Sequence, residues 1–215
     1  MKTSPGGRYD LAALRPPEPD AGIHTPDADA VQTLQTLQRW CLAGSGPGGS
    51  PWWRLRALPT VEKRLSVAHL NQTSFTDDHA VQRLAAQLML ERDGSLQLQA
   101  CRTLAGRLLL RLKTKAHDLM WWRRREPGDA WDSGYLRDGA NGLQAMKQFL
   151  PRRATLLVVD CLEDGLTDAA LVALSLDLQA RQHSFAHPVR LLVLGPLPAA
   201  LKADGATAVI TSSAH

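Results

Sequence analysis

The chain has 215 residues, of which 44% are hydrophobic and 21% are charged, and its formal net charge at pH 7 is +4. This length supports one well-buried core with a loose leader and leaves too little chain for a second full domain. The sequence has no run of about 18 apolar residues, and its opening MKTSPGGRYD lacks the apolar centre of a secretory signal. It therefore predicts a cytoplasmic protein that does not insert into membranes.

The cysteines and histidines argue against a metal centre or a disulfide framework. Cys41, Cys101 and Cys161 are odd in number, widely spaced and set among apolar neighbours. This pattern favours reduced, packed thiols. The histidines form no ligand-spaced group with them.

The first 59 residues are rich in Pro, Gly and Ala and are predicted to be a leader. Apolar residues at Val31, Leu34, Leu37 and Trp40 predict an amphipathic helix over residues 29–42. The stretch LAGSGPGGSPWW that follows looks at first like a phosphate-binding loop. A helix precedes it and no Lys follows, so we interpret it as a flexible linker.

Two adjacent tryptophans, Trp52 and Trp53, close this linker. Exposed paired tryptophans are unfavourable without a partner. They are predicted either to plug a groove of the core or to contact a partner protein.

Strand-like and helix-like segments alternate from residue 60 onward. Val81, Leu84 and Leu88 share one face of a helix that Thr76 or Asp77 is expected to cap, and Thr167 is expected to cap a later helix. This alternation predicts a three-layer α/β domain over residues 60–215, with a mostly parallel sheet and helices on both faces. Ligands of such a sheet bind beyond the carboxyl ends of the strands, here residues 71–78, 160–165 and 195–196. The expected strands are 64–71, 95–102, 155–161, 189–196 and 207–212, and the expected helices are 76–94, 103–122 and 167–182.

The segment ATLLVVDCLEDG is the most specific local signal for chemistry. It is an apolar strand that ends in Asp160, and Glu163 follows three residues later. An acid in this place can hold a magnesium-bound water, and a second acid can orient an attacking water. Alternatively, Asp160 simply turns the chain at the end of the strand.

The segments WDSGYLRDG, PRRATLLVVDCLED and HPVRLLVLGP follow one another between residues 131 and 196. In this order they resemble the middle of the nucleotide-binding domain of bacterial STAND-type NTPases. The resemblance implies a P-loop NTPase fold of the RecA-like kind. It also implies that Asp160 is the Walker B acid and that Glu163 is the acid three residues later.

Three parts of that site are missing from the sequence, namely the glycine-rich phosphate cradle, its Lys and a candidate sensor Arg. Members that hydrolyse ATP carry a Walker A loop before the WDSGYL-like segment, and residues 95–118 there contain no Gly-Lys-Ser/Thr. Gly195-Pro196 stands where the family often has Arg. The resemblance therefore implies a domain that has given up hydrolysis and needs no cofactor, although ATP with magnesium could still bind without turnover.

A basic segment with aromatic residues lies between the second and third of the expected strands. Basic side chains with interleaved aromatics suit phosphate contacts and base stacking. A solvated helix face, or a surface for an acidic protein, explains the same pattern. The residues are Arg107, Arg111, Lys113, Lys115, Trp121, Trp122, Arg123, Arg124 and Arg125, followed later by Arg152 and Arg153.

Three functions remain from the sequence. The first is a catalytically inactive NTPase-like module that binds a protein partner as a regulatory or assembly subunit, through the leader and the Trp/Arg-rich segment. The second is a nucleic-acid-binding accessory protein, whose affinity falls steeply with salt. The third is an NTPase that uses Asp160 and Glu163 with a non-standard phosphate site.

Histidines add one further hypothesis. His69 and His79 flank Asp77 and Asp78 and could form an acid–base group, although capping and solvated roles are commoner for such residues. His183 and His187 are expected to be loop residues.

Overall fold

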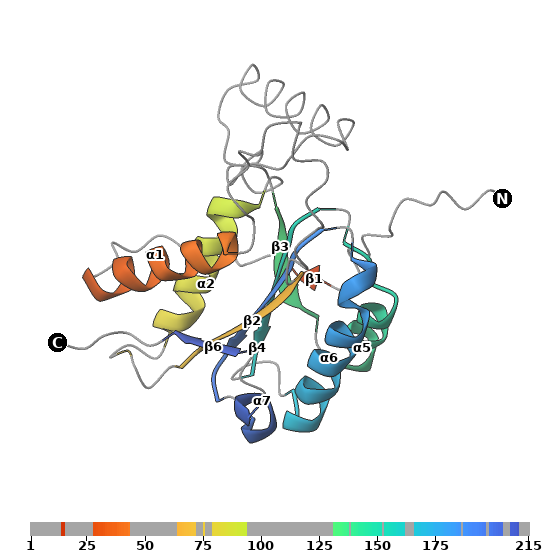
Figure 1. Cartoon of the computed structure of the whole chain (residues 1–215). Helices are drawn as coiled ribbons and strands as arrows, with labels where there is room; N and C mark the ends of the chain where they lie inside the picture. Colours follow the sequence, from red (N-terminus) through yellow and green to blue (C-terminus); the bar gives the residue numbers. More distant parts are fainter. Residues whose placement is uncertain are drawn as a thin grey trace, which may run out of the picture.

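The computed structural model describes residues 14–15, 28–43, 64–71, 75, 79–93, 131–137, 139–151, 153–161, 166–185, 187–196, 198–203 and 207–210. Figure 1 shows their arrangement. The strands are β1 (Leu14–Arg15), β2 (Leu65–Leu70), β3 (Asp132–Leu136), β4 (Thr155–Asp160), β5 (Val189–Leu194) and β6 (Thr207–Ile210). The helices are α1 (Ala28–Leu42), α2 (Ala80–Arg92), α5 (Gly139–Lys147), α6 (Asp168–Arg181) and α7 (Ala199–Ala203), with a short 3-10 helix, η3 (Gln182–Ser184).

One sheet runs through the molecule in the order β1-β3-β4-β5-β2-β6. Every described pairing is parallel except that of β1 with β3, which is antiparallel. The predicted mostly parallel sheet is therefore confirmed. Within the described residues no helix is both long and apolar enough to cross a membrane.

Helices cover both faces of the sheet, as the alternating pattern predicts (Figure 1). Because side chains of a strand point alternately to opposite faces, each strand contributes to two cores. Leu156 and Val158 of β4 pack with α1 and α2, whereas Leu157 and Val159 pack with α5, α6 and α7. Burial on both faces explains why most residues of β4 and β5 are apolar, with Thr155, Asp160 and Arg190 as the exceptions.

The helix boundaries agree with the sequence in one case and differ in another. Thr167 caps α6, because its hydroxyl accepts a hydrogen bond from the Ala170 N–H at 3.3 Å. Helix α2 begins at Ala80 with His79 as its N-cap, and the His79 side chain makes no capping hydrogen bond. The expected cap at Thr76 or Asp77 is therefore wrong, because the helix starts a few residues later than the polar cluster suggests.

Helix α1 packs into the same core as the sheet. Leu34, Leu37 and Trp40 are buried there, as their spacing predicts, and the Trp40 Nε1–H donates to the Ser66 hydroxyl of β2 at 2.9 Å. Val31 is 38% exposed, so its expected place on the buried face is wrong. The neighbouring Ala30 packs against the core instead, so the buried face of the first turn passes through Ala30 and not Val31. The predicted boundary near residue 59 lies outside the described residues.

Along the edge of β3 that faces away from β4, every second residue has a hydrogen-bond partner, beginning with Trp131 just before the strand. The Trp131 N–H donates to the Arg92 carbonyl at 2.9 Å, and the Ser133 N–H donates to the Asp93 carboxylate at 2.9 Å. Tyr135 pairs with Arg15 of β1. These contacts bring the end of α2 against the start of β3. The expected strand at 95–102 and the expected helix at 103–122 lie outside the described residues.

Candidate functional site

The carboxyl ends of three neighbouring strands form the candidate site. Asp160 at the end of β4 pairs with Leu194 at the end of β5, and Leu194 also pairs with Leu70 at the end of β2. These ends lie at one edge of the sheet, as the parallel prediction requires. In open α/β sheets this edge is where ligands bind.

The crevice of such a sheet lies where neighbouring strands send their helices to opposite faces. Here the neighbours are β2 and β5. Helix α2, which follows β2, packs on one core, whereas Leu201 of α7, which follows β5, belongs to the other. The switch point is therefore between Leu70 and Leu194.

His69 ties the two strands together at this point. Its side chain is buried, and its Nε2 is hydrogen-bonded to the Gly195 carbonyl oxygen. The Gly195 N–H in turn donates to the Leu70 carbonyl at 3.2 Å. Gly195 has a φ of 103°, which side-chain-bearing residues rarely adopt, so glycine is required for this turn.

The expectation of a solvated His69 is therefore wrong, because the strand pairing encloses its ring. His79 is exposed at the start of α2, and Asp77 and Asp78 lie outside the described residues. His183 is exposed within η3 rather than in a loop, and His187 lies in a bend before β5.

Asp160 is almost completely buried, with 1% of its surface exposed. By the alternation along β4 its side chain shares the face of Val158, which packs on the α1 and α2 core. His69 shares the face of Val67, which belongs to the opposite core. The sheet thus separates the carboxylate from the imidazole, and the two do not form an acid–base pair.

The backbone after Asp160 is fixed by the Cys161 N–H, which donates to the Leu194 carbonyl at 3.0 Å. Glu163, the proposed water-orienting acid, lies outside the described residues. Among the residues that the structure does describe, no group of three or more His, Cys, Asp or Glu side chains is placed to hold a metal ion.

A buried cation lies at the opposite end of β5. Arg190 is 1% exposed, and it donates from Nε to the Cys41 carbonyl at 3.1 Å and from a terminal nitrogen to the Ala43 carbonyl at 2.5 Å. These are carbonyls at the carboxyl end of α1, where the helix dipole favours a positive charge. Burial lowers the pKa of Arg190 below its ordinary value.

The same contact encloses the Cys41 thiol. Burial raises the pKa of Cys41 to about 12, and the charges of Arg92 and Arg190 oppose that rise. Cys41 and Cys161 are both free thiols, and Cys101 lies outside the described residues. A thiol with so high a pKa is a poor nucleophile, so Cys41 has a structural role.

Sequence reasoning misses Arg190 because it treats the segment VRLLVLGP as an apolar strand and gives its single arginine no role. The available signal is its position: alternation places Arg190 on the same face as Leu192 and Leu194, so a charge there must be buried and capped. Asp93 is missed for a similar reason, because its acceptor role depends on Ser133, which is distant in the sequence.

Most residues predicted to bind a partner lie outside the part of the chain that the structure describes. Arg153 is described, and its guanidinium forms an ion pair with Asp132 at 3.7 Å near the amino ends of β3 and β4. It therefore lies at the opposite edge from Asp160. The residues outside the description are Trp52, Trp53, Arg107, Arg111, Lys113, Lys115, Trp121, Trp122, Arg123, Arg124, Arg125 and Arg152.

Comparison with known proteins adds no family assignment. No family model matches the chain, and no curated protein or solved structure is detectably similar to it.

Proposed function

We propose that this protein is a RecA-like α/β module that does not turn over nucleotide and acts by binding a protein partner, as a regulatory or assembly subunit. The order of the strands supports the fold part of this proposal. Counted along the chain from β2 to β6, the parallel strands lie across the sheet as second, third, fourth, first and fifth. This order agrees with a RecA-like sheet and differs from the Rossmann and flavodoxin-like orders.

The observation that carries the functional part is the connection between β2 and α2. In a RecA-like sheet the phosphate cradle follows the first parallel strand, so its counterpart here is residues 71–79 rather than 95–118. This connection reads NQTSFTDDH, with no glycine, no Lys and no Arg. Its only formal charges are those of Asp77 and Asp78, which repel a phosphate at the start of a helix that would otherwise attract one.

The contact between His69 and Gly195 supports the same conclusion. It joins β2 to β5 across the switch point, where a nucleotide would have to enter. With hydrolysis set aside, binding is the activity that the chain retains.

Calorimetry tests this proposal directly. We expect no heat when ATP or GTP with Mg²⁺ is titrated to millimolar concentration into the full chain. Saturable binding that disappears in Asp160→Asn, but persists in Asp177→Asn as a matched control on α6, would instead establish a nucleotide site and overturn the proposal.

Nucleic acid binding is the second candidate function, because the Trp/Arg-rich segment lies within residues 94–130. The hydrogen bond from Trp131 to Arg92 brings the two flanks of these residues together. Residues 94–130 can therefore be replaced by a short Gly/Ser linker to give a matched control. An affinity for single-stranded RNA or DNA that falls steeply with salt, and that this replacement removes, would favour the second function.

A further inference from the structure

Helix α6 is apolar on both of its faces. Its inner face, which includes Leu171, Leu174 and Leu178, is buried against the sheet with α5 and α7. Its outer face is exposed and consists of Ala169, Ala173, Leu176 and Ala180. Leu176 has 54% of its surface exposed, the largest fraction among the exposed large hydrophobic residues of the described chain.

A surface helix of a soluble protein normally presents polar side chains on its outer face. On α6 the middle of the outer face is apolar instead, and its polar side chains, such as Asp177 and Gln179, stand to the sides. The outer residues of α6 are spaced by four, three and four positions, which is the seam of a coiled coil. Such a seam fits another helix that packs nearly parallel or antiparallel to it.

The seam of α6 is complementary to itself when reversed. In an antiparallel pair, Leu176 of one copy lies opposite Ala173 of the second copy, and the same contact recurs on the other side of the two-fold axis. Ala169 then lies opposite Ala180. Each large side chain thus meets a small one, which is the condition for knobs-into-holes packing.

The charges at the two ends of α6 are complementary in the same arrangement. Asp168 is exposed in the first turn, and His183 is exposed just beyond the last turn. An antiparallel pair brings the carboxylate of one copy close to the imidazole of the other, whose N–H can donate to it. Between these ends the charged side chains next to the seam are Asp177, which is 39% exposed, and Arg181, and they form an ion pair with each other.

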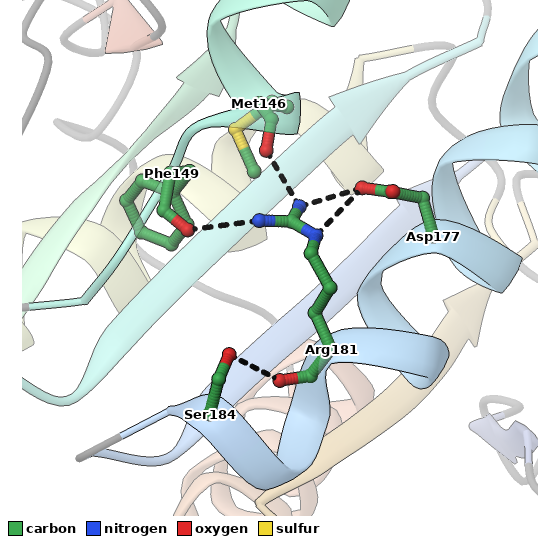
Figure 2. Close-up of polar contacts among 5 residues, drawn as sticks. All are labelled: Met146, Phe149, Asp177, Arg181 and Ser184. Atoms are coloured by element: carbon green, nitrogen blue, oxygen red, sulfur yellow. Dashed lines mark hydrogen bonds and ion pairs between the residues drawn. The ribbon is translucent and has the colours of Figure 1, made fainter.

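The side chain of Arg181 connects the end of α6 to the end of α5 (Figure 2). Arg181 donates to the Met146 carbonyl at 2.7 Å and to the Phe149 carbonyl at 3.2 Å, and it pairs with Asp177 at 2.6 Å. This clamp joins the carboxyl ends of α5 and α6. Leu150, which is 43% exposed, follows Phe149 directly in the chain.

We propose that a second copy of this chain docks on the outer face of α6, as an antiparallel, two-fold symmetric pair of α6 helices. A closed symmetric contact of this kind uses the same patch on both copies. It depends only on α6 and the end of α5, so it holds whether or not the protein binds nucleotide. One helix seam makes a small contact, at or below the low end of specific interfaces at about 1,200 Å². We therefore expect weak association, with a dissociation constant on the order of 10 μM.

Sedimentation equilibrium of the full chain tests the proposal. The mass should rise with concentration from 23.5 kDa toward twice that value. Leu176→Glu should raise the dissociation constant at least about tenfold, with an unchanged circular dichroism spectrum because the residue is exposed. Val31→Glu is the matched control, since Val31 is an exposed apolar residue on α1, and it should dimerise like the native chain.

A monomer at all concentrations up to about 500 μM, roughly fifty times the expected dissociation constant, would overturn the proposal. A dimer that Leu176→Glu leaves intact, or that both substitutions abolish equally, would also overturn it, because neither result places the contact on α6.

Disulfide trapping tests the antiparallel orientation separately. A mixture of the Ala169→Cys and Ala180→Cys variants should form a crosslinked dimer that contains one chain of each. Either variant alone should crosslink no faster than the native chain, whose own thiols provide the background. Rapid crosslinking of Ala169→Cys with itself would show a parallel pair and contradict the proposed arrangement.

Discussion

The pKa of the Cys41 thiol reports whether water reaches the contact between α1 and the sheet. Burial raises its pKa from 9.0 to about 12, against the opposing effect of Arg92 and Arg190. In the unfolded chain the thiol ionises near pH 9.0, so between these two values the folded protein holds a proton that the unfolded chain has lost. The stability that depends on the protonated thiol is complete below pH 9.0 and is lost as the pH rises toward 12.

The loss approaches about 1.4 kcal/mol per pH unit in the middle of this window, and on the order of 4 kcal/mol across it. Urea denaturation between about pH 8.5 and 10.5 is the assay. Over that range the native chain should lose about 2 kcal/mol more stability than Cys41→Ala. Lysines and tyrosines titrate in both proteins, so the difference isolates Cys41.

Parallel stability curves for the two proteins would refute this reasoning. They would mean that the thiol ionises as easily in the folded chain as in the unfolded one. Water would then reach the contact between α1 and the sheet, and the carbonyls that Arg190 caps would be solvated as well.

Three further substitutions test single contacts. Arg181→Met removes the hydrogen bonds that Arg181 makes to the end of α5. It should lower the free energy of unfolding by about 1–3 kcal/mol in urea denaturation. An unchanged free energy of unfolding would show that these hydrogen bonds do not contribute to stability. Gly142→Ala places a Cβ 2.0 Å from the Arg137 carbonyl oxygen, so the start of α5 must shift, and the melting temperature should drop by several degrees. Asp93→Asn sets an amide in place of the carboxylate that accepts from Ser133. It should destabilise by about 1–2 kcal/mol and speed amide exchange at Ser133, and native exchange there would argue against the contact.

The periodic parts of the fold are predictable from the sequence because their pattern is local. β4 and β5 are mostly apolar because helices cover both of their faces. The start of α6 can be predicted because Thr167 is a typical N-cap residue. By contrast, β3 reads DSGYL and shows neither alternation nor a β-branched run. Its strand conformation comes from pairing with β4 and from the acceptor that Asp93 provides, and no local pattern reports either.

The candidate site is predictable in position and not in detail. Strand–helix alternation places Asp160 and the turn at Gly195 at the same edge of the sheet. It does not reveal that the His69 ring bonds across that edge, because this contact joins residues that are far apart in the chain. Nor does it reveal that Arg190 caps α1, because an arginine in an apolar strand gains a partner only once the helix has docked.

The place of β2 in the sheet has a consequence for how the protein is made. β2 (Leu65–Leu70) is flanked by β5 (Val189–Leu194) and β6 (Thr207–Ile210), which the ribosome produces long after it. At about 5–20 residues per second, β2 waits on the order of ten seconds before either neighbour exists. Throughout this delay its backbone edges lack both of their native partner strands, although α1 and α2 can already cover one of its faces. Strands with open edges readily pair with other chains. Synthesis that slows before β5 should therefore increase aggregation of the nascent chain, whereas a delay after β6 should not.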